Sequence, residues 1–299
     1  MSKLITKYKN GNYTVRLYDD GTKIKLTKDN KFIPEFPECI DCNISTKCDG
    51  HCEYCYLNCN ENGIHADLTD PIFDTLHSGI ELAINANDLT HPQLEDFLIK
   101  MKEKGVIVNL TINQKHLRKN ESKLKNWQDR QLVWGIGVSL IDSTDDILWN
   151  NSLKNVIIHV IDGCFSKDDL KNLKNHNIKL LILGYKIKGR GIDYYEKHKD
   201  LIYQNIDFLD DHLYDYRPYF SGFAFDNLAI EHLNIELKVE SEKWEKHHMG
   251  EEGEFSMFID LTKKYYSISS TDDIYQWPLK TNINEMFNHV REVSLNEKD

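Results

Sequence analysis

Short apolar runs alternate with helical patterns through the middle of this 299-residue chain, and this alternation limits its fold more than any other feature. Leu94, Leu98 and Met101, for example, mark one face of a helix between two of the runs. Strands that alternate with helices form a parallel sheet with right-handed crossovers. The sequence therefore predicts an α/β fold, a partial (β/α)6 TIM-like barrel. The six predicted strands are 39–45, 80–85, 106–112, 133–140, 155–161 and 179–184.

Two smaller units are expected beside this barrel. Alternating apolar residues around Asp-Asp-Gly at 19–21 predict a small N-terminal β-hairpin, followed by a linker, over residues 1–36. The barrel is expected over 37–195. The repeating pattern then fades, and 196–299 is predicted to be a C-terminal α+β extension packed on the barrel, with a closing hairpin and a final helix at 283–291. The three parts are expected to form one unit.

Three of the seven cysteines form the motif Cys48-x3-Cys52-x2-Cys55. Thiolates at this spacing can bind three irons of a [4Fe–4S] cluster and leave the fourth iron without a protein ligand. A small molecule can bind that open iron and accept an electron from the cluster. Residues 46–55 directly follow the first predicted strand, and sites in α/β barrels gather at the carboxyl ends of the strands. The motif and the predicted fold therefore indicate the same end of the molecule.

A structural zinc site is the alternative interpretation of these cysteines. Cys39-x2-Cys42 and Cys52-x2-Cys55 make two pairs, and four thiolates suit tetrahedral Zn²⁺. The pairs are separated by nine residues, against about 15–20 in the commoner two-pair zinc pattern. Cys39 and Cys42 also lie in a predicted strand, where residues three apart point to opposite faces. The iron–sulfur cluster is therefore favoured over zinc, and disulfides come third. The cysteines outside the motif are interpreted as buried or bystander thiols: Cys39, Cys42, Cys59 and Cys164.

Tyr54, the aromatic residue before the third motif cysteine, completes a Cys-x3-Cys-x-aromatic-Cys pattern. With it the sequence resembles the radical S-adenosylmethionine (SAM) superfamily. The segments CDGHCEYCY, NGIHADL, VIVNLTINQKHL, LGYKIKGRG and FSMFIDL extend this resemblance to short bacterial and phage members. The resemblance implies a [4Fe–4S] cluster on Cys48, Cys52 and Cys55 with SAM on the open iron. Reductive cleavage of SAM would give a 5′-deoxyadenosyl radical, which abstracts hydrogen from an unidentified substrate. A donor such as flavodoxin or ferredoxin would supply the electron.

The resemblance also suggests which residues lie near SAM. Tyr54 is expected beside the adenine. Asn85, Ala86 and Asn87 stand where the family has a glycine-rich segment that binds the SAM amino group, but the glycines and the carboxylate are missing here. The carbonyls of Asn85 and Ala86 and the Asn87 amide could accept from an ammonium, and a simple polar turn is the alternative. The other predicted cofactor-binding residues follow later strands: Asn113, Ser139, Gly184 and Tyr185.

The substrate is not specified by any motif, and no catalytic residue is assigned. A polar rim would suit a small polar or phosphorylated substrate; it consists of Asn113, Gln114, Lys115 and Lys186. The net charge of −11 argues against direct binding to nucleic acid, which needs clustered positive charge. Free thiols and the lack of a long apolar run predict a cytoplasmic protein with no membrane partner.

Two other functions stay open. The first is a non-catalytic iron–sulfur or zinc protein with a degenerate SAM site. It is favoured by Asn85-Ala86-Asn87, which replace the glycine-rich segment of the family. A phage-type enzyme that modifies nucleotides or nucleic acid is the other. The oligomeric state is likewise open.

Overall fold

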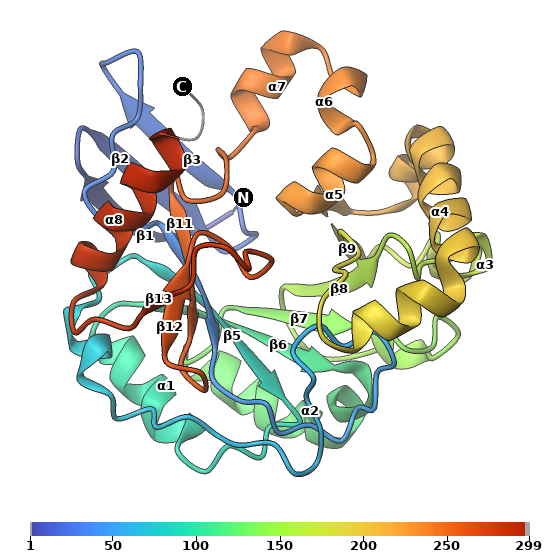
Figure 1. Cartoon of the computed structure of the whole chain (residues 1–299), viewed down its shortest axis with the longest axis horizontal. Helices are drawn as coiled ribbons and strands as arrows, with labels where there is room; N and C mark the ends of the chain where they lie inside the picture. Colours follow the sequence, from blue (N-terminus) through green and yellow to red (C-terminus); the bar gives the residue numbers. More distant parts are fainter. Residues whose placement is uncertain (1, 297–299) are drawn as a thin grey trace.

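The computed structural model describes residues 2–296 and has a mixed α/β fold built around one large, mostly parallel sheet (Figure 1). The sheet has ten strands in the order β10-β9-β8-β7-β6-β5-β4-β11-β12-β13. The predicted α/β class is confirmed, and so are all six predicted strands, which lie side by side in chain order with parallel pairing. They are β4 (Cys39–Asn43), β5 (Glu81–Asn87), β6 (Ile107–Asn113), β7 (Gly135–Ser139), β8 (Val156–Ile161) and β9 (Lys179–Leu183).

Four later strands enlarge this sheet. Strand β10 (Gly222–Phe225), which the sequence analysis did not identify, pairs in parallel with β9. The predicted C-terminal hairpin is confirmed as β11 (Ser256–Asp260) and β12 (Tyr265–Ser267). Strand β11 also pairs in parallel with β4, and β13 (Trp277–Pro278) pairs with β12. The predicted extension over 196–299 therefore contributes to the main sheet.

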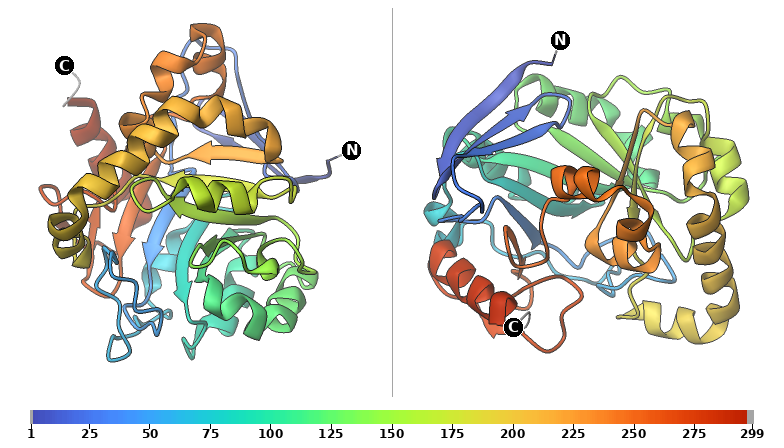
Figure 2. Two further views of the ribbon diagram at one scale, coloured as in Figure 1. Left: turned by 90° about the vertical axis from the view of Figure 1, so that its right-hand side faces the viewer. Right: turned by 90° about the horizontal axis from the view of Figure 1, so that it is seen from above.

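Helices pack along the outer side of the sheet, where α4 and α8 lie on opposite sides of the molecule (Figures 1 and 2). The four helices between the parallel strands are α1 (Leu94–Glu103), α2 (Gln114–Asp129), α3 (Lys167–Leu173) and α4 (Arg190–Tyr216). The last part of the chain adds α5 (Asn227–His232), α6 (Ile235–Lys238), α7 (Ser241–His247) and α8 (Ile283–Asn296), which confirms the predicted final helix. Short 3₁₀ turns lie at Pro71–Thr75, Asp146–Leu148 and Arg217–Tyr219. No helix in the described part of the chain combines the length and apolarity needed to cross a membrane.

The two faces of the parallel strands differ in side-chain size. On the outer face, branched residues such as Leu82, Val108 and Ile136 are fully buried against the helices and form the main core. On the inner face the alternate positions carry small or polar residues, for instance Ala83 and Gly135. In closed (β/α)8 barrels the inner face is usually filled with branched side chains. Here the small residues leave a cavity of about 1220 Å³.

A three-stranded antiparallel sheet covers the amino ends of the parallel strands. It consists of β1 (Leu4–Asn10), β2 (Tyr13–Tyr18) and β3 (Lys23–Thr27). The predicted hairpin is β2–β3, and β1 is an additional strand. Lys23 forms an ion pair with Glu81 of β5, and Lys179 of β9 donates a 3.0 Å hydrogen bond to the carbonyl of Asp20. The turn between β2 and β3 therefore lines the cavity at this end.

Candidate functional site

The residues predicted to bind the cluster and SAM gather around the cavity on the inner face of the sheet. Cys48, Cys52 and Cys55 line it, although they come from a loop rather than from a strand. Most of the predicted cofactor residues line it as well: Tyr54, Asn85, Asn87, Asn113, Ser139, Gly184 and Tyr185. Ala86 is the exception, because its side chain is buried in the core on the outer face.

The cysteine loop follows β4, at its carboxyl end, and its two arms are paired with each other. The amide of Cys48 donates to the carbonyl of Asn60 (2.9 Å), and the amide of Asn60 donates to the carbonyl of Thr46 (3.0 Å). Further along, the amide of Thr46 donates to the carbonyl of Ile64 (2.9 Å). These bonds fold residues 46–64 back on themselves, so the three motif cysteines lie within one ordered loop.

Two N–H groups point at the sulfur atoms of this loop. The amide of Gly50 donates to Cys48 Sγ at 3.3 Å, and Asn113 Nδ2 donates to Cys52 Sγ at 3.7 Å. Gly50 fits between them because it has no side chain: a Cβ there would lie 2.8 Å from Asn113 Nδ2 and 3.2 Å from Cys48 Sγ. N–H donors stabilise thiolates, so this arrangement suits sulfur atoms that act as metal ligands.

The third motif cysteine contacts a neighbouring thiol instead. A hydrogen bond from Cys59, supported by backbone N–H groups, lowers the pKa of Cys55 to about 6. Burial raises the pKa of Cys48 to about 11 and also raises that of Cys52. The Cys55 thiol is therefore the most acidic of the three motif cysteines.

The donor set fits an iron–sulfur cluster in kind and in position. Three thiols of one loop face one cavity, and the close packing at Gly50 leaves no side chain between the first two and Asn113. In the described part of the chain, however, no three His, Cys, Asp or Glu side chains converge as ready-made metal ligands. In this structure the Cys55 side chain is hydrogen-bonded to Cys59.

The Asn-Ala-Asn segment at the end of β5 holds the start of the cysteine loop. Asn85 accepts from the amide of Ile44 (2.7 Å) and donates to the carbonyl of Ser45 (2.8 Å). Asn87 donates to the same Ser45 carbonyl (3.1 Å) and to that of Lys47 (3.0 Å). Both amide side chains are thus occupied by protein. The Ala86 carbonyl, expected to accept from SAM, accepts from the amide of Leu89 at 2.7 Å in a turn.

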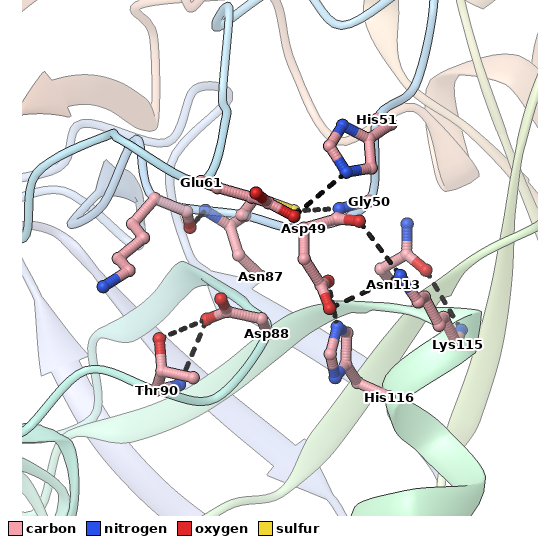
Figure 3. A network of polar contacts seen from close by, with 12 residues as sticks. Asp49, Gly50, His51, Glu61, Asn87, Asp88, Thr90, Asn113, Lys115 and His116 are labelled. Carbon is pink, nitrogen blue, oxygen red and sulfur yellow. Dashed lines mark hydrogen bonds and ion pairs between the residues drawn. The ribbon is translucent and has the colours of Figure 1, made fainter.

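A polar network ties the middle of the loop to the start of α2 (Figure 3). His116 Nε2 and Lys115 Nζ both contact the Asp49 carboxylate, and Lys115 also donates to the Asp49 carbonyl (3.1 Å). Burial acts to raise the pKa of Asp49, but the hydrogen bonds from His116 and Lys115 outweigh it and hold the pKa below its usual range. Asn113 caps α2 by accepting from the amide of Lys115 (3.0 Å). The sequence analysis missed Asp49 and His116.

The segment after β9 holds the other side of the loop. Arg190 donates to the carbonyls of Cys52 (Nε, 3.0 Å) and Cys59 (Nη1, 2.9 Å), and its own amide donates to the carbonyl of Cys55 (3.1 Å). Gly189 has φ of +58°, and a Cβ there would lie 2.5 Å from the carbonyl oxygen of Tyr56. Only glycine tolerates both conditions. The chain can therefore pass directly against the cysteine loop at this point.

Aromatic rings form the wall beside the motif. Tyr54 packs edge-to-face on Tyr194 of α4, with ring centroids 5.6 Å apart, and burial raises the pKa of its phenol. The Tyr185 hydroxyl donates to the carbonyl of Gly191 (2.7 Å). Gly184 makes room for Leu228 rather than for a ligand, because a Cβ at this position would lie 2.4 Å from the Leu228 side chain. Its amide donates to Asp226 (2.9 Å).

The predicted polar rim is only partly present at the cavity. Asn113 and Lys186 line it, but Gln114 and Lys115 do not. Gln114 holds the segment after β7 by accepting from the amide of Ile141 (2.7 Å) and donating to the carbonyl of Asp142 (2.9 Å). Lys115 holds Asp49, as described above.

The cysteines outside the motif have separate surroundings. Cys39 and Cys42 lie on the regular strand β4, on opposite faces, and so do not approach the motif as a pair. Cys59 contacts Cys55, and Cys164 lies at the cavity wall near Tyr54. All seven cysteines are free thiols.

Comparison of the chain with models of known protein families finds no match, and comparison with curated protein sequences finds none either.

Proposed function

We propose that this chain is a radical SAM enzyme with a partial (β/α)6 barrel. The observation that carries the proposal is the position of Cys48, Cys52 and Cys55, which line one cavity at the carboxyl end of the first parallel strand. Tyr54 lies within the same loop and faces the same cavity. The run of parallel strands and the hollow inner face of the sheet support the barrel.

Each part of the site has a role in this proposal. Cys48, Cys52 and Cys55 would hold the cluster, which when bound supplies the electron for reductive cleavage of SAM. Asn113 and the Gly50 amide donate to the sulfur ligands, and so tune their basicity. Arg190 and Asp49 fix the loop through contacts to other segments. Tyr54 and Tyr194 offer a flat apolar surface to the adenine.

A protein that binds the cluster but not SAM is the second candidate. One observation favours it. The side-chain amides of Asn85 and Asn87 are hydrogen-bonded to the cysteine loop, and the Ala86 carbonyl already accepts a hydrogen bond within a turn. The segment that should receive the SAM amino group therefore has fewer free acceptors than the proposed reaction needs. Ser139 lines the same cavity, and its hydroxyl and the second lone pair of each carbonyl could still accept from the amino group.

Measurement of 5′-deoxyadenosine tests the proposal. The protein is reconstituted anaerobically with iron and sulfide, then given SAM and a strong reductant. Cys55→Ala removes a ligand, and Cys164→Ala is the matched control, since it also removes a cavity-wall thiol. We expect product from the wild type and from Cys164→Ala but not from Cys55→Ala. An assembled cluster without product would favour the second candidate, and zinc in place of iron in the purified protein would overturn both.

A further inference from the structure

Two cysteine side chains contact each other in the cysteine loop: Cys55, a motif residue, and Cys59, which lies outside the motif. The Cys55 side chain is hydrogen-bonded to the Cys59 thiol, and the backbone amide of Cys59 also donates to Cys55 Sγ. Two atoms of Cys59 therefore lie against one sulfur atom. Both residues line the cavity, and both are free thiols in this structure.

The backbone between these two cysteines brings residues four positions apart together. The amide of Asn58 donates to the carbonyl of Cys55 (3.2 Å), which closes a turn over residues 55–58. Asn58 has φ of +57°, a left-handed conformation that asparagine adopts more readily than most residues. The turn returns the chain to Cys55 at the next residue, Cys59.

Contacts with other segments hold both ends of this turn. The amide of Arg190 donates to the carbonyl of Cys55 (3.1 Å), and its Nη1 donates to the carbonyl of Cys59 (2.9 Å). From another direction, Asn87 Nδ2 donates a weak hydrogen bond to Cys59 Sγ at 3.9 Å. The pair is therefore held by residues of β5 and α4, and its contact does not depend on the turn alone.

The motif itself offers a different pairing, which this structure disfavours. Cys52 and Cys55 have the Cys-x2-Cys spacing of many redox-active disulfides. Cys52 Sγ is instead hydrogen-bonded to Asn113 Nδ2 (3.7 Å) and to the carbonyl of Gly50 (4.0 Å). A disulfide needs a specific approach of its two side chains, so a pair that is already in contact needs the smaller rearrangement.

We propose that Cys55 and Cys59 are a redox-active pair, which small-molecule disulfides oxidise to an intramolecular disulfide. Cys55, the more exposed of the two, attacks one sulfur of the small disulfide, and a first thiolate leaves. Cys59 Sγ then attacks Cys55 Sγ in the mixed disulfide and displaces the second thiolate. The two protein thiols lose two electrons and two protons. The small disulfide takes up both and leaves as two thiols.

For the proposed cluster, this disulfide is a competitor. Metal binding needs the thiolate form of cysteine, so an oxidised Cys55 can no longer bind iron. The chain would keep only two motif ligands, Cys48 and Cys52. Iron binding would then require surroundings that keep the pair reduced. This consequence rests on the proposed function, whereas the disulfide itself does not.

Disulfide mapping of the full chain tests the pair directly. The cluster-free protein is reduced, freed of reductant under anaerobic conditions, and exposed to glutathione disulfide. After the remaining thiols are alkylated, chymotrypsin cleaves after Tyr54 and Tyr56 and so places Cys52, Cys55 and Cys59 on three different peptides. We expect a link between the peptides of Cys55 and Cys59, which dithiothreitol reverses. A link between Cys52 and Cys55, or no link at all, would overturn the pair.

Two serine variants separate the two steps. In Cys59→Ser, glutathione bound to Cys55 should persist about tenfold longer or more than in the wild type, because an oriented intramolecular attack is faster than attack from solution. The added mass on the intact protein measures this lifetime. Cys52→Ser is the matched control and should still form the link between Cys55 and Cys59. Equal lifetimes in Cys59→Ser and the wild type would show that Cys59 is not the resolving thiol. The mapping of the wild type does not depend on the folding of either variant.

A parallel measurement separates the pair from the proposed function. Protein reconstituted with iron and sulfide should resist glutathione disulfide at Cys55, and oxidised protein should take up iron only after reduction. The link between Cys55 and Cys59 without any cluster assembly would uphold the pair and reject the proposed function. Formation of 5′-deoxyadenosine together with a link between Cys52 and Cys55 would reject the pair alone.

Discussion

Arg190 Nε donates a 3.0 Å hydrogen bond to the carbonyl oxygen of Cys52, a residue 138 positions earlier in the chain. The same guanidinium reaches the carbonyl of Cys59 with Nη1. A planar guanidinium can bind two carbonyls at once in a fixed geometry, which a lysine ammonium cannot reproduce. Arg190 therefore sets the distance between the two ends of the segment that carries Cys55.

This contact predicts a loss of iron binding in Arg190→Lys. The variant keeps the charge but loses at least one of the two hydrogen bonds, so we expect the free energy of unfolding to fall by about 1–3 kcal/mol. Iron retained after anaerobic reconstitution and desalting should fall with it. Arg118→Lys is the control, because the Arg118 side chain pairs with Asp145 and Asp146, at the 3₁₀ turn after β7 and outside the cysteine loop. Equal iron retention in the two variants would show that Arg190 does not hold the loop.

The amide of Asn85 predicts a second stability effect. Asn85→Ala leaves the amide of Ile44 and one interaction of the Ser45 carbonyl unsatisfied, and each such loss costs about 1–3 kcal/mol. Urea unfolding of the variant should show this loss. Asn62→Ala, at an exposed position in the cysteine loop, should unfold like the wild type. If both variants unfold alike, the side chain of Asn85 does not anchor the loop.

The low pKa of Cys55 predicts early alkylation. The reactive form is the thiolate, whose fraction rises as pH passes the pKa, about 6 for Cys55 against about 8.5 for an ordinary cysteine. Iodoacetamide should therefore modify Cys55 of the cluster-free protein with a midpoint near pH 6, measured by mass spectrometry of peptides. Cys59→Ala removes the hydrogen-bond donor and should move this midpoint upward. An unmoved midpoint would mean that Cys59 does not stabilise the thiolate.

The lowered pKa of His159 predicts that the folded protein loses stability in mild acid. Its pKa is about 4 in the folded protein, because burial disfavours the charged ring, and about 6.5 when unfolded. A depressed pKa contributes stability above pH 6.5 that disappears as pH falls toward 4. The contribution is at most about 3 kcal/mol, since each pKa unit corresponds to about 1.4 kcal/mol. Urea unfolding from pH 7 to pH 4 should show a flatter decline for His159→Gln. Parallel declines would contradict the assignment.

The strands that the sequence predicted are those with a strong local signal. Each of the six carries buried branched residues on the outer face, as in Ile107–Asn113, and is separated from the next by a helix or a turn. Strand β10, with the sequence GFAF, is short and half-exposed, so its apolar pattern is weak. The pairing of β11 with β4 has no local signal at all, because it joins segments more than 200 residues apart.

Within the site, the sequence located the cysteines but not what holds them. Cys48, Cys52 and Cys55 were identifiable because thiol spacing is a local property. The partner of Asp49 is His116, 67 residues away, and such a contact depends on the register of β6 and the start of α2. The Asn85 carbonyl and the Asn87 amide were expected to accept from SAM. The side chains of both residues instead bind the cysteine loop, because β5 runs beside the end of β4. The sequence shows that polar side chains at strand ends will form hydrogen bonds, but it does not show with which residues.

The pairing of β4 with β11 also has a consequence for biosynthesis. Asn43 at the end of β4 donates to Asp260 at the end of β11, 217 residues later. At about 5–20 residues per second, the ribosome needs about 10–45 s to make the intervening chain. During that time the motif cysteines have emerged without the neighbouring strand that completes their support. If the chain binds the proposed cluster, iron and sulfide are therefore expected to enter only after β11 has been made, and the nascent chain would need its thiols kept reduced until then.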